Sequence, residues 1–406
     1  MENLTLMNVQ EAQANIGSYI QRTPLDHSQT YSKMTNSEIY LKLENMQKTG
    51  SFKVRGAANK ISKLTSLEKK YGVIASSAGN HAQGVALAAS RGGIPATIVM
   101  PESAPIAKID ATRGYGANVI LYGNVYDDAY EKAKEIQAVT GATFIHPFDD
   151  LDVMAGQGTI GLEILEDLPD VDTVLVPVGG GGLISGIAVA IKSLRPKVRV
   201  IGIQAAEAAS MSEALRSGHP ILIDTANTLA DGIAVKRAGD LTFDHIKQWV
   251  DDIVTVTEDE ISAAILSLME RAKSIAEGAG SVALAAALNA KVDITKQKTV
   301  LVISGGNIDV NFLAQIIERG LLTNGRSMVF RTILPDRPGN LEKLLILIAK
   351  ERANVLTVEQ VRYDLSVPLR YARVTMTLET LNYEHQEKVL QSIREAGYPF
   401  QKDIRH

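Results

Sequence analysis

The first 325 residues alternate between short apolar runs and longer stretches with helical spacing. Several of these runs are apolar at every position, which is typical of strands that are covered by helices on both faces. The alternation predicts βαβ units and an α/β fold with a largely parallel sheet. Strands are expected at 38–44, 72–76, 96–101, 118–123, 173–178, 198–204 and 299–305, and helices at 9–21, 56–70, 81–91, 126–139 and 277–290.

A different pattern begins after residues 321–330, where turn residues without a clear period indicate a linker. From 329 to 406 the order is strand, helix, strand, strand, helix, strand, which is the ferredoxin-like plan. We therefore expect an α/β domain over 1–325, with a smaller subdomain at about 45–150, and an α+β domain over 329–406. The strands of the second domain are expected at 329–336, 354–364, 369–380 and 398–404.

Composition excludes several classes of function. The 42 basic and 46 acidic residues give a net charge of -4, and no long basic run is present, so nucleic acids and anionic membranes are poor partners. The absence of cysteine excludes disulfides, thiolate metal sites and a cysteine nucleophile. The start of the chain lacks a signal-peptide pattern, and no apolar run is long enough to span a bilayer. We expect a cytoplasmic protein.

Four consecutive glycines, 179–182, follow an apolar strand and precede a helix in the stretch VLVPVGGGGLISG. Such a loop can direct several backbone N–H groups toward one point, as in phosphate-binding loops. A tight turn alone does not need four glycines. A nucleotide-triphosphate loop would carry Lys and Ser or Thr after the glycines, and a dinucleotide site would need an acidic residue at a later strand end. Neither Gln204 nor Glu207 meets the second requirement convincingly.

A lysine, Lys53, lies in GSFKVRGA, two residues before Arg55. Most lysines at helix starts are solvated surface charges, and the stretch alone does not exclude this. The alternative is an amine that forms a Schiff base with an aldehyde, which requires a pKa below the ordinary value of about 10.4. Arg55 could lower that pKa or serve the fold, and a catalytic role for it is not expected.

Two further stretches end strands with small residues. Residues 75–89, ASSAGNHAQGVALAA, lead from a strand into an alanine-rich helix, whose free N–H groups could bind a carboxylate. Asn80 offers a donor and an acceptor there, whereas His81 in a first helical turn is more often structural than a base. Ser304, in VLVISGGN, lies at a strand's carboxyl end, the usual place of ligands in open α/β sheets.

Together these stretches resemble the pyridoxal-phosphate enzymes of the tryptophan-synthase β-like fold, in particular the threonine dehydratases (threonine ammonia-lyases). The quoted motifs are ENMQKTGSFKVRGA, SSAGNHAQGVA, PVGGGGLISG and ISGGN. The resemblance covers nearly the whole chain, because residues from about 329 resemble the ACT-like regulatory domain of that family. It implies a fold type II catalytic domain that converts L-threonine into 2-oxobutanoate and ammonia with pyridoxal 5'-phosphate, with activity toward L-serine as well.

The resemblance also implies roles for single residues. Lys53 would carry the cofactor and remove the α-proton, with Phe52 nearby. Asn80 would bind the ring hydroxyl and Ser304 the ring nitrogen, where a hydroxyl favours elimination over transamination. The phosphate would be held by Gly179, Gly180, Gly181, Gly182 and Leu183, and the substrate carboxylate by Ser77, Ala78, Gly79, Asn80 and His81.

Departures from related enzymes sharpen the expectation. Serine racemase uses a serine as second base where this chain has Ala78, so elimination is expected without racemisation. No metal is expected, because Gln204 and Ser210 stand where the racemase has carboxylates. Cysteine-synthase relatives carry a Thr-Ser-Gly-Asn-Thr loop, which residues 76–84 do not match.

The tail carries a candidate effector loop, LPDRPGNLEKLL, at 334–345. The resemblance implies an amino-acid effector, with isoleucine as inhibitor and valine as its antagonist, bound near Pro338, Gly339, Asn340 and Leu341. A domain that only mediates dimerisation through its sheet edge remains the alternative. The family suggests a homodimer or homotetramer.

Competing functions remain open from the sequence. They are a lyase for serine or hydroxyaspartate, a catabolic instead of an isoleucine-forming threonine dehydratase, a nucleotide-dependent oxidoreductase, and a non-catalytic amino-acid sensor. Lys53 and Ser304 argue against the sensor.

Overall fold

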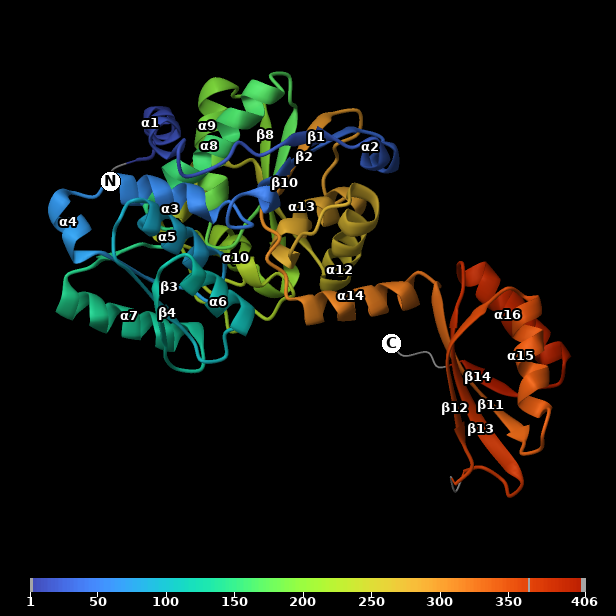
Figure 1. Ribbon diagram of the computed structural model, residues 1–406. Helices are drawn as coiled ribbons and strands as arrows, with labels where there is room; N and C mark the ends of the chain where they lie inside the picture. The colour runs from blue at the N-terminus through green and yellow to red at the C-terminus, as the bar shows by residue number, and fades with distance from the viewer. Residues whose placement is uncertain (1–2, 364–365, 403–406) are drawn as a thin grey trace. The chain divides into compact units, whose positions relative to one another are not determined.

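The chain forms two compact units, residues 1–309 and 310–406. The computed structural model describes residues 3–363 and 366–402, and Figure 1 shows their helices and strands. The division precedes helix α14 (Val310–Thr323), whereas the sequence suggested a linker at 321–330. Because α14 reaches Thr323 and β11 begins at Ser327, only a three-residue turn connects them. Residue 364 of one expected strand and residues 403–404 of another lie outside the described residues.

The larger sheet of the first unit has six strands in the order β1-β2-β10-β7-β8-β9. Strand β1 is antiparallel to β2, and the other neighbours are parallel. The expected α/β plan with a largely parallel sheet is therefore confirmed. The strands are β1 (Leu25–His27), β2 (Glu38–Leu43), β7 (Thr173–Pro177), β8 (Arg199–Ala205), β9 (Asp252–Val256) and β10 (Lys298–Ile303).

Both faces of the sheet are buried at its central strands, which explains the long apolar runs of β7, β8 and β10. On one face, valines of β7, β8 and β10 pack against α8 (Leu151–Asp167) and α9 (Gly182–Leu194). On the other face, α13 (Gly278–Leu288) packs against four of the strands, with α12 (Glu258–Ser267) beside it.

The smaller sheet has four parallel strands in the order β5-β4-β3-β6. Helix α5 (Asn80–Arg91) covers one face with α3 (Lys53–Ser62), and α7 (Tyr126–Thr140) covers the other. All these elements lie within the expected smaller subdomain, about 45–150. The strands are β3 (Val73–Ser76), β4 (Ala96–Met100), β5 (Asn118–Leu121) and β6 (Thr143–Phe144).

The remaining helices of the first unit differ in part from the sequence expectation. The helix expected at 56–70 is two helices, because Thr65 and Glu68 form a capping box that starts a new one. The helix expected at 9–21 begins and ends earlier, at α1 (Leu6–Ile16). The others are α2 (Gln29–Thr35), α4 (Ser66–Tyr71), α6 (Ile106–Gly114), α10 (Ser210–Ser217) and α11 (Asp240–Trp249).

The second unit has an antiparallel sheet in the order β12-β13-β11-β14, the strand order of a ferredoxin-like fold. Helices α15 (Asn340–Lys350) and α16 (Tyr383–Glu395) enclose its core on one face. This arrangement is consistent with an ACT-like domain. The strands are β11 (Ser327–Pro335), β12 (Asn354–Val361), β13 (Tyr371–Glu379) and β14 (Phe400–Lys402).

Two features are absent from residues 3–363 and 366–402. No helix there is long and apolar enough to cross a membrane. No cluster of three or more His, Cys, Asp or Glu side chains is arranged to hold a metal ion. Gln204, one of the two positions where serine racemase has a carboxylate, accepts hydrogen bonds from the backbone N–H and the hydroxyl of Ser212.

Candidate active site

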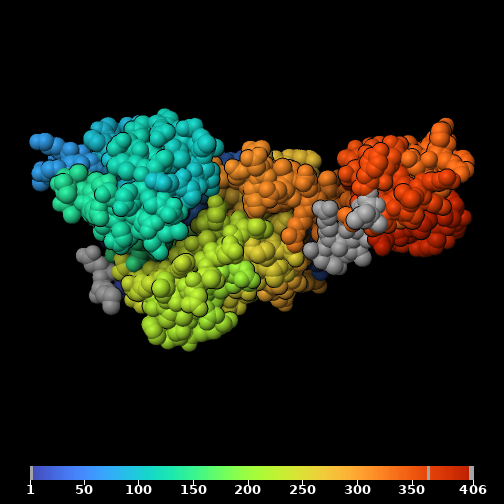
Figure 2. All heavy atoms as spheres, turned by 90° about the horizontal axis from the view of Figure 1, so that it is seen from below, coloured from blue at the N-terminus to red at the C-terminus, as the bar shows by residue number. Residues whose placement is uncertain are grey.

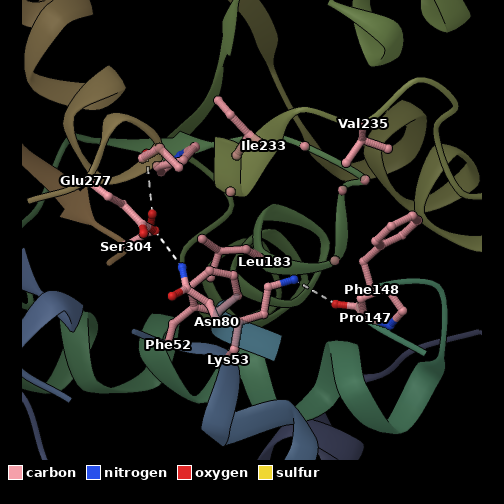
Figure 3. A pocket seen from close by; sticks show the side chains of 17 residues that line it. Phe52, Lys53, Asn80, Pro147, Phe148, Leu183, Ile233, Val235, Glu277 and Ser304 are labelled. Atoms are coloured by element: carbon pink, nitrogen blue, oxygen red, sulfur yellow. Dashed lines mark hydrogen bonds between the residues drawn. The ribbon is translucent and has the colours of Figure 1, made fainter. Parts of the chain in front are cut away.

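A pocket lies between the two lobes of the first unit, one built on the smaller sheet and the other on the larger sheet. Figure 2 shows residues of about 100–150, in cyan to teal, as one lobe beside the yellow-green lobe of the larger sheet. Figure 3 shows the pocket from close by. It is lined by Phe52, Lys53, Asn80, Pro147, Phe148, Pro177, Gly179, Gly180, Gly181, Gly182, Leu183, Gly232, Ile233, Val235, Glu277, Ala279 and Ser304.

Lys53 is the first residue of α3, and its amine lies inside the pocket, where it donates to the backbone oxygen of Pro147 at 2.9 Å. Burial lowers the pKa of Lys53 to about 8, although the charge of Glu277 opposes this shift. The segment is held in place by a 3.1 Å hydrogen bond from the backbone N–H of Phe52 to the backbone oxygen of Ser304. Lys53 is thus a buried amine with an increased neutral fraction at pH 7.

The glycine loop connects β7 to α9 and forms one wall of the pocket. The first helical hydrogen bond of α9 runs from Ser185 N–H to the oxygen of Gly181, at 3.0 Å. The N–H groups of Gly182 and Leu183 precede that bond, so they have no acceptor within the helix. The positive end of the helix dipole adds to their attraction for an anion.

Glycine is required in this loop by close contacts. A Cβ atom on Gly180 would lie 2.4 Å from the ring of Phe148, and one on Gly182 would lie 2.8 Å from the same residue's backbone oxygen. Gly181 has φ +98°, in the region that side chains disfavour. Phe148 comes from the smaller lobe, so the glycines let the two lobes approach closely.

Asn80 begins α5 and points into the pocket, where its Nδ2 donates to Glu277 Oε1 at 2.6 Å. Glu277 is buried at the N-terminal end of α13. Burial raises the pKa of Glu277 to about 7; the charge of Asp231 acts in the same direction, and Lys108, Asn80 and Lys53 act against it. This carboxyl group was not foreseen from the sequence.

Ser304 lies just past β10 and is buried in the pocket wall. Its hydroxyl donates to the backbone oxygen of Ala279 at 3.3 Å, a long and therefore weak hydrogen bond. The hydroxyl can turn toward a group inside the pocket at small cost.

The structure does not bring the whole predicted carboxylate loop into the pocket. Among the described residues that line it, Asn80 is present, whereas Ser77, Ala78, Gly79 and His81 are not. His81 is buried and its Nε2 donates to the backbone oxygen of Ile145 at 2.8 Å. Burial, aided by the charge of Lys53, lowers the pKa of His81 to about 3, so it is neutral and structural.

Arg55 points away from the pocket into the protein core. It forms ion pairs with Glu44 at 2.8 Å and Glu163 at 2.7 Å, and Lys42 also pairs with Glu163. Burial lowers the pKa of Arg55, but the two carboxylates outweigh this effect and raise it above the ordinary value. Burial, not Arg55, is the main cause of the lowered pKa of Lys53. Of the two roles considered for Arg55, the contacts favour the structural one.

Comparison with known proteins identifies the family. A family model described as "Pyridoxal-phosphate dependent enzyme" matches residues 16–306. The chain belongs to this family. Members of the family use pyridoxal phosphate, so the expected cofactor is confirmed, and the protein is an enzyme of this class.

The relatives of this pyridoxal-phosphate enzyme include threonine-degrading lyases. An L-threonine ammonia-lyase of Thermotoga maritima is 54% identical over 395 residues, which cover 97% of this chain and 98% of that protein. A catabolic L-threonine dehydratase of Escherichia coli K12 is 51% identical over 308 residues, 75% of this chain and 94% of that protein. A processed threonine deaminase isoform 2 from Solanum lycopersicum has a TM-score of 0.74 at 39% identity, over 78% of this chain and 95% of that one.

The pocket fits the cofactor of this family. Lys53 offers an amine for the aldehyde group, and the N–H groups of Gly182 and Leu183, which have no acceptor within the helix, offer a seat for the phosphate. Apolar atoms of Phe52, Leu183 and Ala279 line the space between them, which suits an aromatic ring.

Proposed function

We propose that this chain removes the α-proton and the β-hydroxyl of L-threonine, with the hydroxyl leaving as water. Water then hydrolyses the released enamine to 2-oxobutanoate and ammonia. The observation that carries the proposal is the meeting of Lys53, Asn80, the glycine loop and Ser304 in one pocket. The near full-length similarity to an L-threonine ammonia-lyase supports the choice of substrate.

Roles for the pocket residues follow from their chemistry. Pyridoxal phosphate, when bound, withdraws electrons from the substrate and so acidifies the hydrogen on its α-carbon. Lys53 acts as the base that takes this hydrogen as a proton, because its buried amine is partly neutral near pH 8. Asn80 orients the ring oxygen, and residues 179–183 anchor the phosphate. For the substrate carboxylate we keep the backbone at the N-terminal end of α5, over Ser77, Ala78, Gly79 and His81, beside the pocket; the ring of His81 takes no part, because it is bonded to the oxygen of Ile145.

Two side chains restrict the reaction to elimination. Ser304 offers a hydroxyl to the ring nitrogen and so leaves it less positively charged than a carboxylate would, which disfavours transamination. Ala78 has no group that could return a proton to the opposite face of the α-carbon, so racemisation is not expected.

Absorption spectroscopy and a substrate panel test the proposal. The purified protein should be yellow and should release 2-oxobutanoate from L-threonine, with slower release of pyruvate from L-serine. Lys53→Ala should lose the visible absorption band and turnover, whereas Lys60→Ala, on the same helix, should keep both. Full activity of Lys53→Ala would refute the assignment of the lysine, and turnover of serine or hydroxyaspartate alone would refute the substrate.

We further propose that the reaction serves isoleucine formation and that the second unit binds an amino-acid effector. Support comes from how much of this chain each relative covers. The alignment with the catabolic dehydratase covers 75% of the chain, whereas the alignment with the Thermotoga maritima ammonia-lyase covers 97% and so extends into the second unit. Gly339, with φ +86°, precedes α15. The N–H group of Asn340 donates to Arg337, and the next ones, of Leu341 and Glu342, precede the first helical bond from Lys343 to Gly339; they could bind a carboxylate beside Pro338.

Deletion of residues 328–406 tests the regulatory part. The truncated protein should keep threonine deamination and lose inhibition by isoleucine and its relief by valine. Unchanged inhibition would place the effector site elsewhere, and no response in the full chain would leave dimerisation as the role of the second unit. The homodimer or homotetramer and the cytoplasmic location remain predictions; sedimentation and cell fractionation measure them.

A further inference from the structure

A chain of side-chain hydrogen bonds runs through Asn80 from a backbone anchor to a buried carboxyl group. Asn307 Nδ2 donates to the backbone oxygen of Thr49 at 2.8 Å and to Asn80 Oδ1 at 2.7 Å. Asn80 Nδ2 then donates to Glu277 Oε1 at 2.6 Å. Asn307 ends the ISGGN motif, and neither it nor Glu277 has a role in the proposed reaction so far.

This chain permits one orientation of each amide. An asparagine amide can turn by half a circle with little change of shape, but the turn exchanges a donor for an acceptor. If Asn307 turned, its oxygen would meet the backbone oxygen of Thr49, and two acceptors would face each other. If Asn80 turned, its oxygen would meet the carboxyl group of Glu277, and its nitrogen would meet the amide nitrogen of Asn307.

Glycines enclose both ends of the chain closely. A Cβ atom on Gly50 would lie 2.3 Å from Asn307 Oδ1, and Gly50 also has φ +70°. At the other end, a Cβ atom on Gly305 would lie 2.4 Å from Glu277 Oε1, and one on Gly232 would lie 3.2 Å from it. Because these three positions are glycines, the side chains of Asn307 and Glu277 fit beside them. The same close packing restricts the rotation of both side chains.

We propose that Asn307 and Glu277 are positioning residues that fix the Asn80 amide so that it presents an N–H group, and not its oxygen, to the bound cofactor. This inference rests on the proposed function, which assigns Asn80 to the ring oxygen. Asn80 Nδ2 carries two hydrogens, and Glu277 takes one of them. The second hydrogen is available to the pocket, where it would stabilise negative charge on the ring oxygen. With the amide reversed, two oxygen atoms would face each other.

A double-mutant cycle with Asn80 tests this role. The measured quantity is the dissociation constant of pyridoxal phosphate from the holoenzyme, followed by absorption and fluorescence. Asn307→Ala should weaken binding by about 3- to 10-fold, the usual effect of one hydrogen bond. In an Asn80→Ala background the same change should have an effect below about 2-fold, since the amide to be oriented is gone. Asn289→Ala removes a comparable amide at the end of α13 and should not alter binding.

Isosteric variants separate orientation from packing. Asn307→Asp keeps the shape but places an acceptor against Asn80 Oδ1, so it should weaken binding more than Asn307→Ala does and should shift the cofactor's absorption band. Glu277→Gln still offers an acceptor to Asn80 and should bind the cofactor nearly as the wild type does, whereas Glu277→Ala should not.

Equal weakening by Asn307→Ala in both backgrounds would overturn the inference, because Asn307 would then act on the fold and not through Asn80. A thermal unfolding scan identifies variants that do not fold; in that case Asn307→Leu, which has nearly the same shape and no donor, takes the place of Asn307→Ala in the cycle and is judged by the same criterion. If the wild-type protein holds pyridoxal phosphate but turns over no amino acid, the proposed function fails, whereas additive binding effects refute only this inference.

Discussion

Burying the carboxyl group of Glu277 imposes a pH-dependent cost on the fold, and Glu277→Gln should remove it. Burial raises the pKa of Glu277 from an ordinary 4.5 to about 7. Below pH 4.5 the group is protonated in both the folded and the unfolded chain. Between pH 4.5 and 7 the folded chain holds the proton more tightly, so stability falls as the pH rises through this range, and above pH 7 the full cost is present.

The size of the effect follows from the pKa change. One pKa unit corresponds to 1.36 kcal/mol, so a change from 4.5 to about 7 amounts to about 3 kcal/mol at pH 8. For a unit of 309 residues, with an unfolding entropy of about 2.1 cal/mol/K per residue, this equals roughly 4–5 °C in melting temperature.

Fluorescence of the single tryptophan provides the assay. Trp249 lies on α11 in the first unit, so its signal reports on the unit that holds Glu277. Melting temperatures of the cofactor-free wild type and of Glu277→Gln should agree near pH 4.5 and diverge toward pH 8, with the variant more stable. Glu131→Gln, an exposed change on α7, should show no such divergence. A constant difference between wild type and Glu277→Gln across this pH range would refute the reasoning.

Three further changes have expected outcomes. Gly180→Ala should abolish measurable cofactor binding in an absorption titration, because the new methyl group would lie 2.4 Å from the ring of Phe148. Gly114→Ala is the control, since its methyl group would meet nothing within 4 Å, and it should bind normally. Equal binding by both variants would contradict the assignment of the glycine loop to the phosphate. Arg55→Met should cost about 3–5 kcal/mol in urea unfolding, because it leaves buried carboxylates uncompensated, and a loss below about 1 kcal/mol would contradict the ion-pair argument. Lys108→Met removes a charge that lowers the pKa of Glu277, so the pH range over which stability falls should extend further upward in the same melting experiment. A range that ends at lower pH than in the wild type would show the opposite sign of coupling.

The sequence predicts the parts of the fold whose signals are local. Strands such as β7 and β10 contain continuous apolar runs, and both were located to within two residues at each end. Helix α8 was not foreseen, because it is buried along most of its length and therefore lacks an amphipathic period. The break between α3 and α4 did have a signal, the Thr65 and Glu68 capping pair, which the helical spacing masked.

The residues of the site also fall into two groups, those that a local motif reveals and those that only the folded structure reveals. Lys53 and the glycine loop stand in motifs whose chemistry is legible from a few neighbouring residues. Glu277 is 197 residues from Asn80 in the chain, and in sequence it is one acidic residue before an alanine-rich helix. The carboxyl group meets Asn80 because α13 of the larger lobe and α5 of the smaller lobe both begin at the pocket, and a pairing across that distance in the chain has no local signature.

The buried ion pairs around Arg55 constrain how this chain can evolve. Lys42, Glu44, Arg55 and Glu163 balance two positive charges against two negative ones without access to water. Any single replacement that removes one charge leaves an excess charge in the core, and its cost of about 3–5 kcal/mol is a large part of the roughly 5–15 kcal/mol by which most proteins stay folded. A neutral core of the same volume could be equally stable, but it can be reached only through changes at two or more of these positions together. Homologous lineages should therefore carry the four residues as a set, or lack them as a set.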